Sequence, residues 1–169
     1  MKHLILGGAR SGKSRYAEQL ALANHKRLVY IATAEAADEE MAARIAQHQA
    51  QRSEHWHLVE EPLDLALRLS EFDDADTAIL VDCLTLWLSN CLHHGVFERK
   101  RRELLERLPT LQSDLYLVSN EVGSGVVPLG QLSRMFVDNS GHLHQALATH
   151  CERVSLVVAG LPLELKRPD

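Results

Sequence analysis

Gly7-Gly8-Ala9-Arg10-Ser11-Gly12-Lys13-Ser14 is the stretch that decides the fold, because a glycine and four residues precede Gly-Lys-Ser. This spacing is typical of a phosphate-binding loop. Glycines let backbone N–H groups close around phosphate oxygens, Lys13 reaches the β- and γ-phosphates, and the Ser14 hydroxyl can bind Mg²⁺. A buried strand is predicted before the loop, and a helix is predicted over residues 14–23. A bound phosphate would then lie at a helix N-terminus. The alternative is a glycine-rich turn that arose by chance, but it explains neither the predicted strand before the loop nor the predicted helix after it.

Length and composition favour one globular domain over residues 1–169. With 46% hydrophobic and 24% charged residues, the chain can bury a core without disulfides or metals. A net charge of −5 argues against a nucleic-acid partner, which needs a basic face. The three cysteines are an odd number without metal-binding spacing, so we expect reduced thiols. Because Met1 leads directly into the first strand, we expect no membrane span and a cytoplasmic location.

Strands and helices alternate along the chain. Further strands are predicted at residues 27–33, 55–61, 78–82, 114–119 and 153–159. Such alternation predicts an α/β fold, with a mostly parallel sheet covered by helices on both faces. The helix expected over residues 131–152 is predicted to break near residues 139–141. After the last strand we expect residues 160–162 to lead into a short polar tail.

Two predicted strands end in residues suited to a nucleotide. In an open parallel sheet, ligands lie beyond the carboxyl ends of strands, so Thr33, Ala34 and Glu35 are expected near the phosphate loop. An ordinary strand-to-helix turn explains any one of them equally well. Asp82 directly follows the apolar run of residues 78–81. In many nucleotide-binding proteins, a carboxylate at the end of such an apolar strand holds Mg²⁺, usually through water. Apolar strands that end in aspartate are common, but the phosphate loop upstream strengthens this interpretation.

A polar helix predicted over residues 38–51 carries a histidine between two cations. Arg44, His48 and Arg52 recur at four-residue steps and therefore share one helix face. The two guanidinium groups could form an anion site and keep the imidazole neutral and nucleophilic near pH 7. A solvated helix face with a bystander histidine fits the same spacing.

Five segments taken together resemble one enzyme family. They are GGARSGKS (7–14), YIATAEAADEEMAARIAQHQAQR (30–52), LVDCLTLWLSN (80–90), VSNEVGSGVVP (118–128) and VVAGLP (157–162). Their order and spacing are similar to those of the bifunctional adenosylcobinamide kinase/adenosylcobinamide-phosphate guanylyltransferases of cobalamin biosynthesis. The resemblance covers nearly the whole chain and implies a P-loop NTPase-like (RecA-like) three-layer sandwich.

The resemblance also implies two reactions, with GTP and ATP as substrates and Mg²⁺ as cofactor. A nucleoside triphosphate phosphorylates adenosylcobinamide, and GTP then gives its GMP to an enzyme histidine, which passes it to adenosylcobinamide phosphate. The family's Arg-Ile-x-x-His pattern matches residues 44–48, so the guanylylated residue would be His48, with Arg44 and Lys13 as its catalytic partners. The resemblance places Gln49, Arg52, Glu60 and Asp82 in the nucleotide site, Asp82 on the Mg²⁺ together with Ser14.

The resemblance further implies a homo-oligomer, namely a trimer. It is weakest after Pro128, where Val137, His142 and His144 replace two arginines and an asparagine of the family pattern. The residues that would bind the corrinoid are therefore where this chain matches the family pattern least. Two other interpretations stay open: a monofunctional small-molecule kinase in which His48 is a surface residue, and a nucleotide-dependent switch that binds a protein partner.

Overall fold

The computed structural model describes residues 1–35 and 55–168, and these residues form a seven-stranded sheet. Its strands are β1 (Lys2–Gly7), β2 (Arg27–Ala32), β3 (Trp56–Glu60), β4 (Thr77–Asp82), β5 (Asp114–Asn120), β6 (Arg153–Val158) and β7 (Leu161–Lys166). They lie in the order β3-β2-β4-β5-β1-β6-β7. All neighbours pair in parallel except β6 and β7. The predicted α/β class with a mostly parallel sheet is confirmed.

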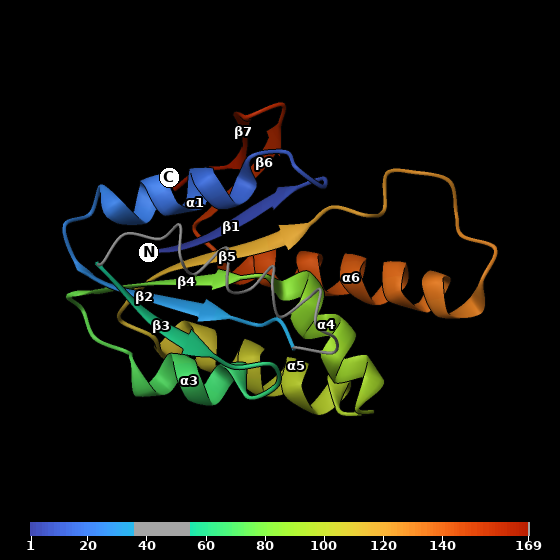
Figure 1. The fold of residues 1–169 in the computed structure, drawn as a ribbon, viewed down its shortest axis with the longest axis horizontal. Coiled ribbons are helices and arrows are strands. Elements are labelled where there is room, and N and C mark those ends of the chain that lie inside the picture. Colours follow the sequence, from blue (N-terminus) through green and yellow to red (C-terminus); the bar gives the residue numbers. More distant parts are fainter. Residues whose placement is uncertain (36–54, 169) are drawn as a thin grey trace.

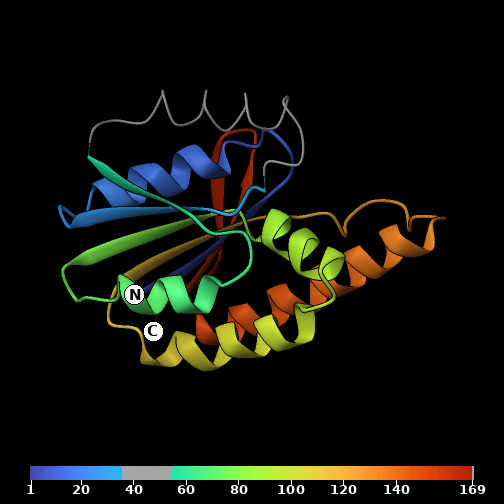
Figure 2. The same cartoon turned by 60° about the horizontal axis from the view of Figure 1, so that its bottom comes forward.

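Helices cover both faces of the sheet (Figures 1 and 2). The helices are α1 (Lys13–Leu22), α3 (Leu65–Glu71), α4 (Leu84–His93), α5 (Phe97–Arg107) and α6 (Gln131–His150), and a 3₁₀ turn follows α5 at Leu108–Thr110. On one face, α1 packs its buried Ala17 and Ala21 against Tyr30 and Leu80 of the strands. The larger core, around the fully buried Trp87, lies between the opposite face and the other four helices that the structure describes. None of the described helices is long and apolar enough to cross a membrane.

The break predicted near residues 139–141 is wrong, because α6 is continuous from Gln131 to His150. Asn139 donates from Nδ2 to the Met135 carbonyl at 2.9 Å, one turn earlier. Helix packing outweighs the single glycine, which costs about 1 kcal/mol relative to alanine, because Leu143 and Leu147 are buried against the sheet.

The polar tail expected after residues 160–162 is also wrong, because residues 161–166 form the edge strand β7. Val158 pairs with Leu161, so only Ala159 and Gly160 make the turn, with φ values of 52° and 79°. Positive φ at both turn residues matches the tight turns that best join two antiparallel strands. The Glu164 carboxylate pairs with Arg153 across the hairpin.

Candidate nucleotide site

The phosphate loop (residues 7–14) joins β1 to α1, as predicted. Gly7 is the last residue of β1, and α1 begins at Lys13. The backbone has positive φ at Arg10 (55°) and Gly12 (92°), which turns the chain sharply before the helix. The Lys13 side chain is only 8% exposed, and its Nζ donates to the Gly8 carbonyl at 3.1 Å. The ammonium group therefore lies against the loop, at the N-terminal end of α1, where an anion is favoured.

Two glycines of the loop are required by space. A Cβ at Gly7 would lie 2.4 Å from Ser11 Oγ and 2.7 Å from the Val157 carbonyl oxygen. At Gly12, a Cβ would lie 3.1 Å from the Cα of Gly160, and the positive φ disfavours other residues. The turn between β6 and β7 also donates to the loop, from the Gly160 N–H to the Ser11 carbonyl at 2.8 Å. The end of the chain thus supports the phosphate loop, a contribution that the sequence analysis missed.

Asp82 ends β4 at the same edge of the sheet as the phosphate loop. The intervening strand β5 pairs its Val118 with both Ile5 of β1 and Asp82, which sets the two strand ends at similar height. Tyr30 and Leu80 lie on the α1 face, and because side chains alternate along a strand, Asp82 faces that side too. The carboxylate and Ser14, the second residue of α1, therefore lie at one edge and on one face of the sheet.

The other predicted residues of this edge lie farther from the phosphate loop. Between β2 and β1 lie β4 and β5, so the ends of β2 and β1 are separated by about 14 Å at ordinary strand spacing. Thr33 is fully buried, and its Oγ1 makes two hydrogen bonds with the backbone of Cys83. Ala34 is half-buried, and the exposed Glu35 lies 3.4 Å from His94 Nε2. Glu60 is exposed at the end of β3, the outermost strand.

Four predicted residues, Arg44, His48, Gln49 and Arg52, lie outside the described residues. Their predicted roles in nucleotide binding and catalysis therefore stay predictions. The chain enters that segment from the end of β2 and leaves it at the start of β3.

A partly buried polar network lies at the end of β5, between the phosphate-loop strand and the strand of Asp82. Ser119 Oγ lies 2.8 Å from His144 Nε2 and 3.4 Å from Thr85 Oγ1, and Thr85 Oγ1 accepts the Asn120 N–H at 2.7 Å. Glu121 donates its N–H to the Gly7 carbonyl at 3.0 Å. Burial lowers the pKa of His144, while nearby Glu121 acts in the opposite direction.

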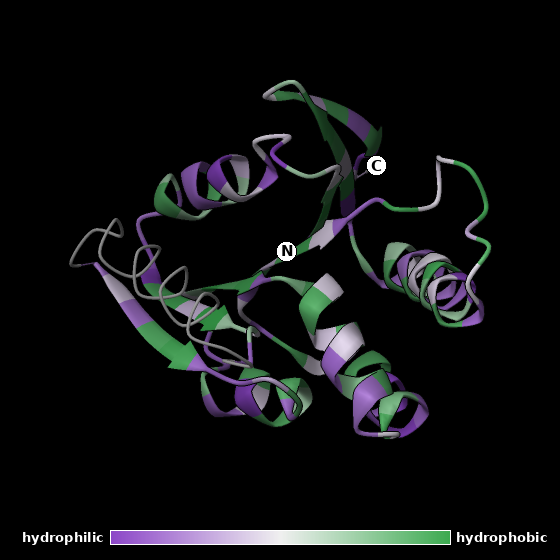
Figure 3. Ribbon diagram, turned by 45° about the vertical axis from the view of Figure 1, so that its right-hand side comes forward, coloured by the Kyte–Doolittle hydropathy of each residue, from purple (hydrophilic) through white to green (hydrophobic). Residues whose placement is uncertain are grey.

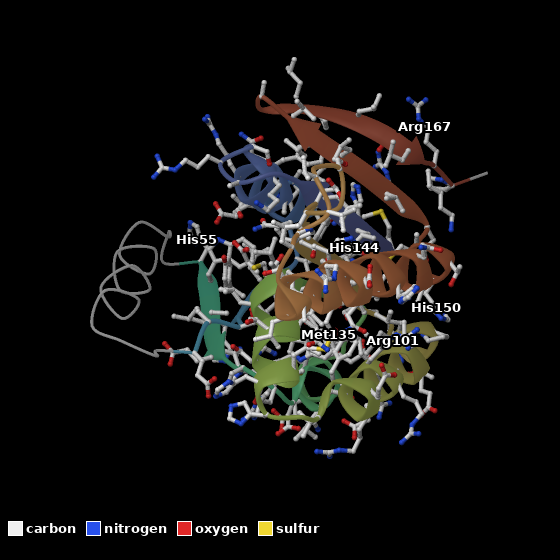
Figure 4. The ribbon with its side chains drawn as sticks, turned by 90° about the vertical axis from the view of Figure 1, so that its right-hand side faces the viewer. His55, Arg101, Met135, His144, His150 and Arg167 are labelled. Atoms are coloured by element: carbon white, nitrogen blue, oxygen red, sulfur yellow. The ribbon has the colours of Figure 1, made fainter. Side chains whose placement is uncertain are left out.

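His144, labelled on α6 in Figure 4, is one of the three departures from the family pattern. It reaches β5 through the Ser119 contact, whereas His142 is exposed and Val137 is half-buried. The sequence identified His144 only as a departure, and the contact with Ser119 required the structure. A histidine here gives the end of β5 a polar partner from α6.

Large apolar side chains are exposed from the loop after β5 to the first turn of α6. Val126 is 96% exposed, Leu129 97% and Leu132 77%. This segment extends beyond the sheet in Figure 1, and much of it is coloured hydrophobic in Figure 3. It begins beside the phosphate loop, where Glu121 contacts Gly7.

A phosphate loop at the end of β1, a carboxylate at the end of β4 and a strand between them define a P-loop NTPase-like fold of the RecA-like type. Solved structures of the same fold include the flagellar accessory protein FlaH from Methanocaldococcus jannaschii, with a TM-score of 0.50 at 14% identity, covering 99% of this chain and 78% of that one. The KaiC-like protein PH0186 from Pyrococcus horikoshii has a TM-score of 0.51 at 15% identity, covering 92% and 69%. At such identities the likeness concerns the fold alone.

The family follows from sequence comparison. A family model described as cobinamide kinase / cobinamide phosphate guanyltransferase matches residues 3–165. The chain is 55% identical over 169 residues to the bifunctional adenosylcobalamin biosynthesis protein CobP of Pseudomonas aeruginosa, covering 98% of each. It is 35% identical over 182 residues to the corresponding protein CobU of Escherichia coli, covering 98% of this chain and 100% of that one. The chain belongs to the cobinamide kinase / cobinamide phosphate guanyltransferase family, and it is an enzyme.

Proposed function

We propose that this enzyme phosphorylates adenosylcobinamide with a nucleoside triphosphate and then transfers GMP from GTP to the phosphorylated product, giving adenosylcobinamide-GDP and pyrophosphate. The observation that carries the proposal is the 55% identity, over nearly the full length, to a bifunctional adenosylcobalamin biosynthesis protein. The phosphate loop at the carboxyl edge supports it, because both reactions need the polyphosphate of a nucleotide held in place.

Mg²⁺ would be held by Ser14 and Asp82 together with the phosphates. The described residues contain no group of three or more His, Cys, Asp or Glu side chains suited to a metal. One carboxylate and one hydroxyl on the same side of the sheet edge fit Mg²⁺, which usually takes few protein ligands and completes its shell with phosphates and water. When bound, the ion neutralises charge on the polyphosphate.

In the kinase step, the hydroxyl oxygen of adenosylcobinamide attacks the γ-phosphorus. A new O–P bond forms as the bond to the β,γ-bridging oxygen breaks, the nucleoside diphosphate leaves, and the hydroxyl proton passes to solvent. Lys13 stabilises the charge that develops on the phosphates, since its Nζ is already fixed beside the Gly8 carbonyl. Most of the catalysis in such a transfer comes from positioning and electrostatics.

In the transferase step, a ring nitrogen of His48 attacks the α-phosphorus of GTP and displaces pyrophosphate. The phosphate of adenosylcobinamide phosphate then attacks the same phosphorus, and the P–N bond to His48 breaks. We assign Arg44 and Arg52 to charge stabilisation, Gln49 to the nucleotide, and Glu60 to the guanine or ribose. The resemblance, together with the arginine spacing, supports these roles. The position of Thr33, Ala34 and Glu35 beyond the end of β2 supports adding them to the proposed nucleotide site, with the buried Thr33 acting from beneath it.

We also propose one catalytic domain over residues 1–169, acting in the cytoplasm without a nucleic-acid partner. Strands from both ends of the described chain share one sheet, which supports the single domain. We propose a homotrimer by resemblance, and the exposed apolar side chains at Val126, Leu129 and Leu132 are consistent with a surface that is covered. Light scattering of the purified protein measures the mass directly.

The proposal is tested by product analysis. With adenosylcobinamide, ATP and Mg²⁺, we expect mass spectrometry to find adenosylcobinamide phosphate, and adding GTP should convert it to adenosylcobinamide-GDP. The first product without the second would indicate a monofunctional kinase. If neither product forms while the nucleotide is slowly hydrolysed, the proposed function is wrong and a nucleotide-dependent switch is favoured.

A further inference from the structure

The carboxylate of Asp82 receives a hydrogen bond from the neighbouring strand. Tyr30 of β2 is in register with Leu80 of β4, so its ring lies on the same face of the sheet as Asp82, two residues farther along. The Tyr30 hydroxyl donates to Asp82 Oδ2 at 2.7 Å, and Tyr30 is 1% exposed. Its ring is fixed in turn by an edge-to-face contact with Trp56, with 5.6 Å between ring centroids.

The backbone after Asp82 is held from the same strand. Thr33 Oγ1 donates to the Cys83 carbonyl at 2.6 Å and accepts the Cys83 N–H at 2.9 Å. The Thr33 N–H donates to the Asp82 carbonyl at 3.3 Å, and the Thr33 carbonyl accepts from Asn90 Nδ2 of α4 at 2.8 Å. Side chain and backbone of the Asp82–Cys83 unit are thus both tied to the end of β2.

We propose that Tyr30, supported by Thr33, is a positioning residue that orients the Asp82 carboxylate for the Mg²⁺ of the bound nucleotide. The inference rests on the proposed function, in which Asp82 serves that ion. A carboxylate at a strand end can rotate about its last bond, and ordering it on metal binding costs free energy. The phenol removes that rotation by holding Oδ2. Among the residues that the structure describes, none hydrogen-bonds to Oδ1, which leaves that oxygen for the ion or its water shell.

A purely structural explanation is that the bond merely satisfies a buried phenol. Tyr116 of β5 allows the two explanations to be separated, because it is also 1% exposed and also has its hydroxyl bonded, to Asn24 Nδ2 at 2.6 Å. Asn24 follows α1 at the opposite edge of the sheet. Tyr116→Phe therefore removes an equally buried hydroxyl far from Asp82.

The experiment measures the affinity for Mn²⁺, used as the probe ion, by electron paramagnetic resonance. It uses full-length protein with a non-hydrolysable GTP analogue. Outer-shell partners of a metal site typically contribute about 10- to 100-fold to metal affinity. We expect Tyr30→Phe to weaken Mn²⁺ binding about 10-fold, at the low end of that range, while Tyr116→Phe leaves it unchanged. In turnover, Tyr30→Phe should raise the Mg²⁺ concentration for half-maximal rate more than it lowers the rate at saturating Mg²⁺.

A double variant tests whether Tyr30 acts through Asp82. If it does, adding Tyr30→Phe to Asp82→Asn should change Mn²⁺ binding little further, because the group being positioned is already altered. Equal Mn²⁺ binding in the Tyr30→Phe and Tyr116→Phe proteins, or fully additive effects in the double variant, would overturn the inference while leaving the role of Asp82 intact. If Asp82→Asn itself binds Mn²⁺ like the unmodified protein, the metal role in the proposed function fails as well.

Discussion

The two edges of the sheet use polar groups in opposite ways. At the amino edge, Asp114 at the start of β5 binds the N-terminal ammonium of Met1 and Lys26 Nζ, both at 2.8 Å, and accepts from Asn24 at 2.9 Å. At the carboxyl edge, Gly8, Ala9 and Arg10 of the phosphate loop are exposed to solvent. Polar groups that pair with one another stabilise the fold. Backbone N–H groups of an exposed loop can instead donate to a ligand. We therefore expect substitutions at the carboxyl edge to change activity and those at the amino edge to change stability.

Lys13→Ala should give the largest effect. Removing the ammonium that faces the phosphates should slow both the kinase and the guanylyltransferase reactions about 10²- to 10³-fold, the range for loss of one preorganised donor. The matched control is Lys26→Ala at the amino edge, which should leave both rates within a few-fold of normal. Steady-state rates with both proteins decide the matter, and near-normal turnover of Lys13→Ala would contradict the assignment of the phosphate loop.

Asp82→Asn should come next. The change keeps the shape of the side chain and removes its charge, so we expect the Mg²⁺ concentration for half-maximal activity to rise about 10- to 100-fold. Titrating Mg²⁺ at fixed GTP measures it. An unchanged titration would mean that Asp82 only ends a strand.

His3, in β1 near the amino edge, should control how stability depends on pH. The side chain is fully buried with Nε2 at 2.8 Å from Ser155 Oγ, and burial, helped by Arg153, lowers its pKa from 6.5 to about 4. The unfolded chain therefore binds more protons below pH 6.5, and stability present above that pH is lost as pH falls toward 4. Between pH 7 and pH 5 this group should remove about 2 kcal/mol of unfolding free energy.

Urea unfolding at those two pH values measures the effect. His3→Gln keeps a polar partner for Ser155 without a titrating group, so its pH dependence should be smaller by that amount. His150→Gln, at an exposed histidine of α6, is the control and should retain the full dependence. An unaltered slope in His3→Gln would show that another group is responsible.

Asp114→Asn should give the smallest effect. It weakens the ion pairs with Met1 and Lys26, which are partly exposed, so we expect a loss of about 1 kcal/mol in unfolding free energy. Both catalytic rates should stay unchanged. A clear loss of either rate in Asp114→Asn would contradict the assignment of stability to the amino edge and activity to the carboxyl edge.

Local signals in the sequence predicted much of this architecture. The phosphate loop and its flanking strand and helix depend on neighbouring residues, and Asp82 follows directly from the apolar run before it. The continuous α6 was missed because Gly141 looks like a breaker until Leu143 and Leu147 are seen packed in the core. The signal for β7 that the sequence offered was Ala159-Gly160, a pair suited to a tight turn, between two apolar runs.

Contacts between distant residues could not be read from the sequence. The Tyr30–Asp82 bond joins residues 52 positions apart, and the Gly160–Ser11 bond joins the last hairpin to the first loop. Both depend on the strand order, which places β4 beside β2 and β6 beside β1. Periodicity identifies strands but does not order them, so the support around a predicted site emerges only from the fold.

The central claim is that one enzyme carries out both reactions and that its GMP transfer proceeds through a guanylylated His48. The most direct measurement supplies α-labelled GTP and Mg²⁺ without corrinoid, quenches in alkali and locates the label by mass spectrometry. We predict GMP on His48, lost in mild acid because protonation of the phosphoramidate nitrogen makes it a good leaving group. His48→Ala should abolish labelling while sparing much of the kinase reaction, whose nucleophile is the substrate's own hydroxyl. GMP on His55 or His57 would move the nucleophile downstream, and an unlabelled protein that still phosphorylates adenosylcobinamide would contradict the covalent mechanism.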